Sequence, residues 1–289
     1  EGVSKLVLTN VEENRQLTGE TLADTIIRSR GWSNTRAKQL FLKLVDEQFG
    51  REDGMTRRDI DGNASVDIEH VFPRAIIREG DSDPYAWLSD FFPETGSAVL
   101  ESESNIFELI GLLEKEDAAI IGEDHEMYDR IQRIHTHIKS NFVEDLGNMI
   151  ILEGGVNRAI QNRRFALKLR SYHKEHPEDI KNAVNEYFST DNPGLTEAKV
   201  NELTELDVPT GYDDTEPSLD AIEDEFNGWW NIDRMAERKT KIVSLILESL
   251  VYDIDEEEFT EEFDELLNNR DELKNSIEDE LQKRSNQAI

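Results

Sequence analysis

Two short β-type stretches, far apart in the chain, constrain the fold more than any other feature of this sequence. Residues 65–72 are rich in Val, Ile and Phe, alternate in polarity and end at Pro73. Residues 146–152 form the second stretch, and a Gly-Gly pair follows it. Most of the remaining chain has helical periodicity. We therefore predict an α+β fold that is mostly α-helical, with a small strand–strand–helix core embedded in helices.

The helix of that core is expected directly after the second stretch. A continuous helix from Asn157 would place four polar residues on one face, namely Asn157, Gln161, Arg164 and Lys168. If Asn162 instead caps a new helix, Lys168 still lies one to two turns in. Either reading puts basic side chains next to the strands.

The motifs in these pieces resemble the C-terminal endonuclease domain of the GmrSD-type restriction proteins. This His-Me finger (HNH) family is written roughly as EHxxP, then LGNLxLL, then N, F and K. The matching residues here are Glu69, His70, Pro73, Leu146, Gly147, Asn148, Ile150, Leu152, Asn157, Phe165 and Lys168. The resemblance implies a ββα-metal fold and runs from about residue 17 to residue 252.

The resemblance also implies roles for these side chains. His70 would be the general base, since an imidazole titrates near neutral pH, and Glu69 and Asn157 would hold a metal. Asn148 is expected to clamp the loop between strand and helix. Strand neighbours point to opposite faces, so Glu69 and His70 need a twist or a bulge to converge, and Asp67 is an alternative ligand. The expected catalytic set is His70, Asn148, Asn157 and Lys168.

Oxygen ligands and the absence of cysteine favour Mg²⁺ as the cofactor, with Mn²⁺ able to substitute. Zinc would lack its usual nitrogen and sulfur ligands.

A local excess of positive charge accompanies the second motif. Residues 146–174 contain six basic residues and one acid, whereas residues 203–226 contain nine acids and no base. We expect DNA phosphates to be bound there, by Arg158, Arg163, Arg164, Lys168 and Arg170. The alternative for Arg164 and Lys168 is a solvated helix face.

The net charge of the whole chain, in contrast, is negative. With 64 acidic and 32 basic residues, its net charge is -32, which is unusual for a nucleic-acid-binding protein. We attribute the acidity to a halophilic source, where high salt screens self-repulsion. The alternative is an acidic interaction surface or a DNA mimic.

No run of about 18 apolar residues is present, and residue 1 is Glu rather than Met. We expect a cytoplasmic protein without a membrane segment, and a fragment of a longer chain.

Three parts are expected within one continuous compact domain: a helical part (1–64), the nuclease core (65–172) with a helical insertion at about 79–142, and a helical part with an acidic tail (173–289). In the first part, helices are predicted at 19–30 and from an Asn34 N-cap to Gly50.

The insertion should contain helices at 105–113 and 125–142. His135 and His137 lie two apart and so face different sides of a helix, which favours ordinary histidines over metal ligands. An apolar stripe predicts a long helix at 232–251, capped by Asn231. Trp229 and Trp230 are expected to staple its start. The tail at 253–289 should be a packed or partner-binding helix.

These features predict a metal-dependent DNA endonuclease or nickase, the effector of a prokaryotic restriction or phage-defence system. The resemblance adds a nucleotide-hydrolysing, modification-sensing partner, as an N-terminal domain or a separate chain. The alternative is a catalytically inactive acidic interaction or DNA-mimic module on the same scaffold.

Overall fold

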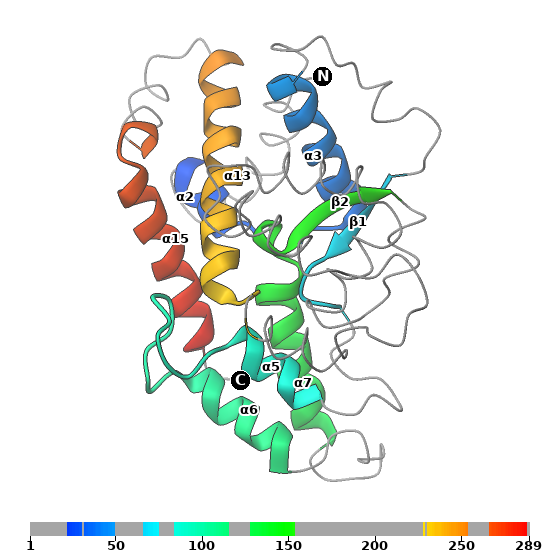
Figure 1. Cartoon of the computed structure of the whole chain (residues 1–289), viewed down its shortest axis with the longest axis vertical. Coiled ribbons are helices and arrows are strands. Elements are labelled where there is room, and N and C mark those ends of the chain that lie inside the picture. Colours follow the sequence, from blue (N-terminus) through cyan, green and yellow to red (C-terminus); the bar gives the residue numbers. More distant parts are fainter. Residues whose placement is uncertain are drawn as a thin grey trace, which may run out of the picture.

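The computed structural model of the chain describes residues 22–30, 32–49, 66–74, 84–115, 128–153, 228, 230–253 and 266–287. These residues form mainly helices and one small sheet (Figure 1), so the prediction of a mostly helical protein is confirmed. The helix expected after the second strand lies outside the described residues. The division into three parts stays a prediction.

Two helices precede the first strand. Helix α2 spans Leu22–Arg28 and α3 spans Asn34–Phe49, close to the predicted ranges. The expected Asn34 cap is wrong, because Ser33 Oγ accepts the Arg36 N–H at 3.4 Å and Asn34 is already the first helical residue. Helix α3 packs on both strands of the sheet.

The sheet has two antiparallel strands, β1 (Val66–His70) and β2 (Met149–Glu153). The second strand begins later than predicted. Leu146–Asn148 instead form a 3₁₀ turn, η2, whose N-cap Asp145 accepts the Gly147 N–H. A short polar side chain that bonds two residues ahead favours such a turn over an extended chain.

Between the strands, the chain forms helices α5 (Pro84–Phe91), α6 (Asn105–Lys115) and α7 (Tyr128–Ile138). Helix α7 continues into a π-helix, η1 (Lys139–Val143), so the predicted helices at 105–113 and 125–142 are broadly confirmed.

Helix α5 was not predicted, because its aromatic residues and its proline resemble a turn, although proline suits the first helical position. Its last residue joins an aromatic cluster with ring centroids 4.3–5.0 Å apart, formed by Phe72, Phe91, Phe92 and Phe142.

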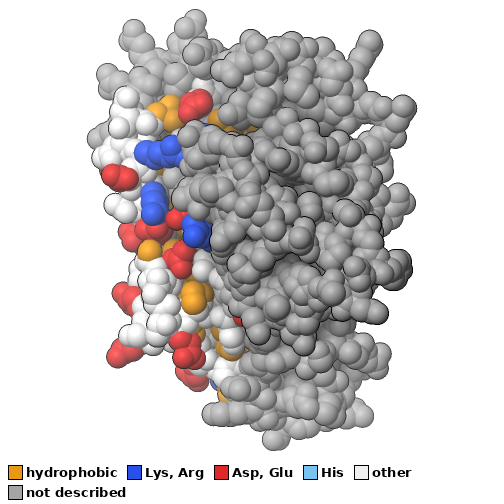
Figure 2. Space-filling model, viewed as in Figure 1, with side chains coloured by type: hydrophobic (Ala, Val, Ile, Leu, Met, Phe, Trp, Pro, Cys, Tyr) orange, Lys and Arg blue, Asp and Glu red, His pale blue; other side chains and the backbone are white. Residues whose placement is uncertain are grey.

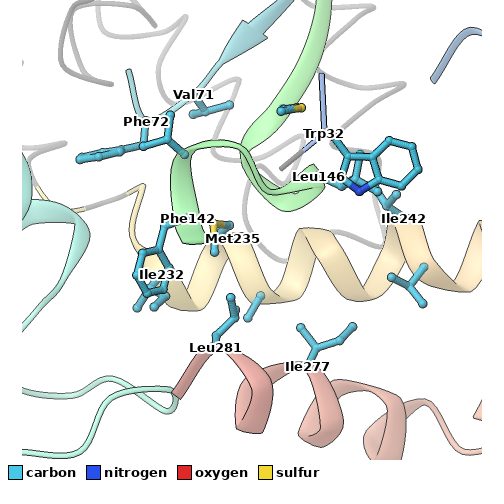
Figure 3. Close-up of a cluster of buried hydrophobic side chains, with 14 of the residues drawn as sticks. Trp32, Val71, Phe72, Phe142, Leu146, Ile232, Met235, Ile242, Ile277 and Leu281 are labelled. Carbon is cyan, nitrogen blue, oxygen red and sulfur yellow. The ribbon is translucent and has the colours of Figure 1, made fainter. Parts of the chain in front are cut away.

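Helix α13 (Ile232–Asp253) is the centre of the described fold. The Asn231 cap is confirmed, since its Oδ1 accepts the Arg234 N–H at 3.1 Å. Every residue of the predicted stripe is buried: Ile232, Met235, Ala236, Ile242, Val243, Ile246, Leu247 and Leu250. Helix α15 (Arg270–Ser285) lies alongside α13, and Figure 3 shows its Ile277 and Leu281 directed toward that helix.

Charges on the described surface are mixed in sign. Figure 2 shows acidic and basic side chains interspersed on the face drawn there. The pairs Arg28–Glu280 and Lys274–Glu278, at 3.9 and 3.5 Å, are of this kind. In the described part of the chain, every helix is too short or too polar to cross a membrane.

Candidate active site

The sheet places the Glu69–His70 pair beside the start of β2. His70 lies opposite Met149, the first residue of that strand. Glu69 and His70 are buried, with 6% and 4% of their surfaces exposed. Each residue of β1 pairs with one residue of β2, so the described register contains no bulge. The twist of the strand is then the remaining way for the Glu69 and His70 side chains to converge. Asp67 stays the alternative ligand that the sequence predicts.

Asn148 ties the end of β1 to the turn before β2. Its Oδ1 accepts the Phe72 N–H at 2.7 Å and the Trp230 Nε1–H at 3.2 Å. Its Nδ2 donates to Phe72 O at 2.9 Å and to Val143 O at 3.0 Å. An asparagine amide can make four such bonds, and here it makes four while fully buried. The clamp therefore holds the chain two residues after His70, rather than the loop after β2 where we expected it.

The turn itself rests on a buried ionic cluster. Asp145 Oδ1 accepts the Gly147 N–H at 2.9 Å. Its Oδ2 accepts from Lys239 Nζ at 2.6 Å and from Arg284 Nη1 at 2.8 Å. The three charged side chains are fully buried. Such a cluster is expensive to desolvate, and it holds together only when each charge has partners.

The pKa values of this cluster follow from burial and charge. Burial acts to raise the pKa of Asp145, but the Lys239 ammonium and the Arg284 guanidinium outweigh it and hold that pKa below its ordinary value. Burial lowers the pKa of Lys239 to about 8, against the attraction of Asp145. Lys239 is thus still mostly protonated at neutral pH, and the contact is ionic.

Helix α13 packs directly against η2 and explains the glycine in this turn. A Cβ on Gly147 would lie 2.5 Å from Met235 O and 3.0 Å from Lys239 Cβ. Figure 3 shows Leu146 and Met235 at this contact. One turn on, Arg238 Nη2 donates to Met149 O. The helix therefore fixes both the turn and the first residue of β2.

The other predicted site residues lie outside the described residues. They are Asn157, Arg158, Arg163, Arg164, Lys168 and Arg170. Their roles stay predictions.

His135 and His137 lie on α7. Burial lowers the pKa of both. His137 Nδ1 accepts from Asn141 Nδ2 at 2.9 Å, and its Nε2 lies 3.2 Å from Arg284 O, to which the Nε2–H tautomer donates. His137 thus contacts the end of α15 and serves packing in this structure. Across the described ranges, no group of three His, Cys, Asp or Glu residues could hold a metal ion.

Comparison with known families identifies one segment of the chain. Residues 123–206 match the family described as GmrSD restriction endonucleases, C-terminal domain. This segment is similar to the GmrSD C-terminal domain family. It covers less than a third of the 289 residues, and it includes α7, η1, η2 and β2. No curated protein and no solved structure matches the chain.

The match confirms the resemblance predicted from the motifs for residues 123–206, and the predicted extent from about residue 17 to residue 252 stays a prediction. A GmrSD C-terminal domain is an HNH-type nuclease domain, which implies an endonuclease of a restriction system, DNA as its substrate and a divalent metal. His70 lies outside the matched GmrSD segment. The pairing of β1 with β2 places His70 beside the β2 strand of that segment.

The described residues suit an ion that prefers oxygen. Glu69 offers a buried carboxylate beside His70, and the chain contains no cysteine. Mg²⁺ keeps several of its waters and so needs few protein ligands.

Sequence reasoning missed the buried ionic cluster of Asp145, Lys239 and Arg284. A signal was present for two of them. Lys239 falls between Ala236 and Ile242 on the apolar stripe of α13, where a charge needs a buried partner. Asp145 stands two residues before a glycine, as in an Asx turn. Nothing local indicated that these two residues meet.

Proposed function

We propose that this protein is a metal-dependent DNA endonuclease of a prokaryotic restriction or phage-defence system. The observation that carries the proposal is the pairing of β1, which ends in His70, with the β2 strand of the GmrSD segment. Neither strand alone would indicate a site. Together they supply the two strands of the ββα arrangement, and Asn148 locks their ends.

In this proposal His70 is the general base. It takes a proton from a water that attacks the phosphorus in line with the departing 3′ oxygen. A P–O bond to the water oxygen forms and the P–O3′ bond breaks. The departing 3′ oxygen takes a proton from solvent water, which leaves a 5′-phosphate and a 3′-hydroxyl. A bound Mg²⁺ would polarise the phosphate and stabilise charge on the leaving oxygen. The ion would be held by Glu69 and Asn157, with Asp67 as the alternative carboxylate, and Mn²⁺ is expected to substitute.

Asn148 acts in this scheme by holding the strand that carries His70. Its amide is saturated by Phe72, Val143 and Trp230, and its side chain is fully buried. We therefore assign it a positioning role, although we grouped it with the catalytic residues on sequence grounds.

Phosphate binding is proposed for the basic run after β2. Lys168 acts as a point charge and Arg164 as a two-pronged donor, with Arg158, Arg163 and Arg170 adding to the local positive field. One such site cuts one strand, so a monomer is expected to nick. Control by a nucleotide-hydrolysing, modification-sensing domain, within the same protein or on another chain, is part of the proposal.

The test is the conversion of supercoiled plasmid to relaxed circles by the purified protein. Nicking should require Mg²⁺ or Mn²⁺ and stop with EDTA. Salt must be varied from low to molar, because the net charge of -32 opposes DNA binding at low salt. Absence of relaxed circles over that whole range, on both modified and unmodified DNA, would refute the enzyme.

The same charge favours a second candidate, a catalytically inactive acidic module that binds proteins or mimics DNA. It predicts no nicking with any divalent metal. It also predicts that the protein competes with DNA for a basic partner. The plasmid assay therefore separates the two candidates.

A further inference from the structure

The last helix of the described chain has one buried face that ends in a charge. On α15, Leu273, Ile277, Leu281 and Arg284 follow one another at helical spacing, and each is fully buried. The three apolar residues pack the helix against its neighbours. Arg284 continues the same face, one turn beyond Leu281.

Arg284 bonds to two segments that are distant in sequence, residues 141–145 and the end of α2. Its Nη1 donates to Asp145 Oδ2 at 2.8 Å and to Asn141 O at 2.9 Å. Its Nη2 donates to Arg28 O at 3.1 Å, at the end of α2. Its Nε donates to Glu280 Oε1 at 3.0 Å, within α15. Arginine presents several donors in one rigid fork, which suits it to such a junction better than lysine.

From Asp145 the contacts run directly to the strand that carries His70. Asp145 caps the η2 turn through Gly147 N at 2.9 Å. Asn148, which ends that turn, holds Phe72 N at 2.7 Å and Phe72 O at 2.9 Å. Phe72 stands two residues after His70. The Asp145 carboxylate thus links α15 to the η2 turn, and the Asn148 amide links that turn to the residues just after β1.

We propose that α15 is an integral part of the nuclease domain and that Arg284 is a positioning residue, which acts through Asp145 and Asn148 on the strand that carries His70. The proposal rests on the proposed function for its catalytic consequence. Helix α15 lies in the acidic tail, well outside the segment that matches the GmrSD family. The proposal therefore gives the tail a specific structural role.

Because Asp145 is paired with two cations, the positioning role of Arg284 can be tested in a variant that still folds. Replacing Arg284 with methionine leaves Asp145 paired with Lys239 at 2.6 Å, so no buried charge loses its last partner. Glu280 retains some solvent exposure and has Arg28 nearby, at 3.9 Å. The apolar face of α15 is untouched. The variant should therefore fold, with the turn held on one side only.

The experiment compares Arg284→Met with two matched controls on the same helix. Leu281→Ala removes a fully buried side chain with no bond to Asp145. Lys283→Met removes the same charge from an exposed neighbouring position. All are measured under conditions where each protein is fully folded. Arg284→Met should nick plasmid with a kcat lowered about 10- to 100-fold at an unchanged KM, as expected for a small misplacement of a catalytic group. Both controls should keep the wild-type kcat.

Amide hydrogen exchange supplies a readout that does not depend on catalysis. In Arg284→Met, the Gly147 and Phe72 amides should exchange at least tenfold faster than in Leu281→Ala, because their acceptors are no longer held from α15. Equal exchange in the two variants would overturn the proposal, and so would wild-type kcat in Arg284→Met. A wild-type protein that nicks no DNA would refute the proposed function instead, and the exchange result would then decide the positioning role alone.

Discussion

At the scale of single residues, the η2 turn depends on three positions, each for a different physical reason. Gly147 is needed for space, since a Cβ there would lie 2.5 Å from a backbone oxygen of α13. Asn148 is needed for its four bonds. Asp145 is needed because two buried cations face it.

Gly147→Ala should therefore destabilise the protein. The added methyl group would have to displace Met235 or the turn, an overpacking that costs about 1–3 kcal/mol. Urea denaturation measures the effect. Gly111→Ala is the control, because it lies within α6 and its Cβ would have nothing within 4 Å. Alanine is the better helix former, so this variant should gain about 0.5–1 kcal/mol. A neutral Gly147→Ala would contradict the close packing of η2 on α13.

The pH dependence of Asp145 gives a second prediction. Its folded pKa lies below the unfolded value, so its stabilising effect is complete above the unfolded pKa of about 4 and is lost as pH falls through the folded pKa. Asp145→Asn leaves two buried cations without their carboxylate and should cost about 3–5 kcal/mol at pH 7.

The difference in free energy of unfolding between wild type and Asp145→Asn should shrink below about pH 4. Taking the difference cancels the titration of the other carboxylates. A difference that stays constant down to pH 2.5 would show that Asp145 is not ionised in the folded protein.

At the scale of elements, α13 organises the site from a distance of more than 80 residues along the chain. Trp230, two residues before the helix begins, bonds to Asn148 at 3.2 Å, and Lys239 bonds to Asp145 at 2.6 Å. Arg238 lies between them in sequence and holds the first residue of β2. The helix must begin at the right residue for all three to reach their partners.

The start of α13 can be tested through its cap. Asn231→Ala removes the bond from Arg234 N–H to Asn231 Oδ1 and should cost about 1 kcal/mol, whereas Asn231→Ser should cost at most a few tenths, because serine caps nearly as well. Thermal or urea denaturation of the two variants gives the comparison. Equal losses would mean that Asn231 stabilises the protein by other contacts, such as its bond to Gly228 O.

Elements with strong periodicity could be predicted from the sequence. The stripe of α13 and the β1 strand are examples, since their patterns reflect burial directly. Helix α5 could not, because its eight residues include a proline and aromatics that also suit turns. The ionic cluster could not either: its partners are 94 and 139 residues apart, and only the folded chain brings them together. The sequence therefore indicates the motif residues Glu69, His70 and Asn148, whereas the buried cluster that holds the η2 turn is known only from the structure.

At the scale of the whole molecule, charge is the dominant property. The net charge is -32, yet the described surface mixes both signs, and α15 carries acids in its first turn and bases in its last. That distribution complements the helix dipole. The acidity is thus compatible with packed helices, provided that salt screens the total.

Salt should therefore act in two opposing ways. At 0.01 M the Debye length is about 30 Å, so 64 acidic residues repel one another and the thermal midpoint should fall steeply as salt is removed. High salt weakens phosphate binding, with log affinity falling by about 0.9 per contact for each log unit of salt. Nicking should peak at an intermediate to high salt concentration.

Lys168→Ala should flatten the high-salt decline in nicking, because it removes one phosphate contact. A thermal midpoint that is indifferent to salt down to a few millimolar would contradict the halophilic explanation and favour an acidic interaction surface.

We propose that His70, which β1 places beside the β2 strand of the GmrSD segment, performs the chemistry. His70→Ala should abolish plasmid nicking, with a loss of about 10²- to 10⁴-fold in rate, while DNA binding and folding persist. His135→Ala, which removes a half-buried histidine of α7, is the matched control and should nick at the wild-type rate. More than a tenth of wild-type activity in folded His70→Ala would remove this residue from the mechanism and contradict the account of the site.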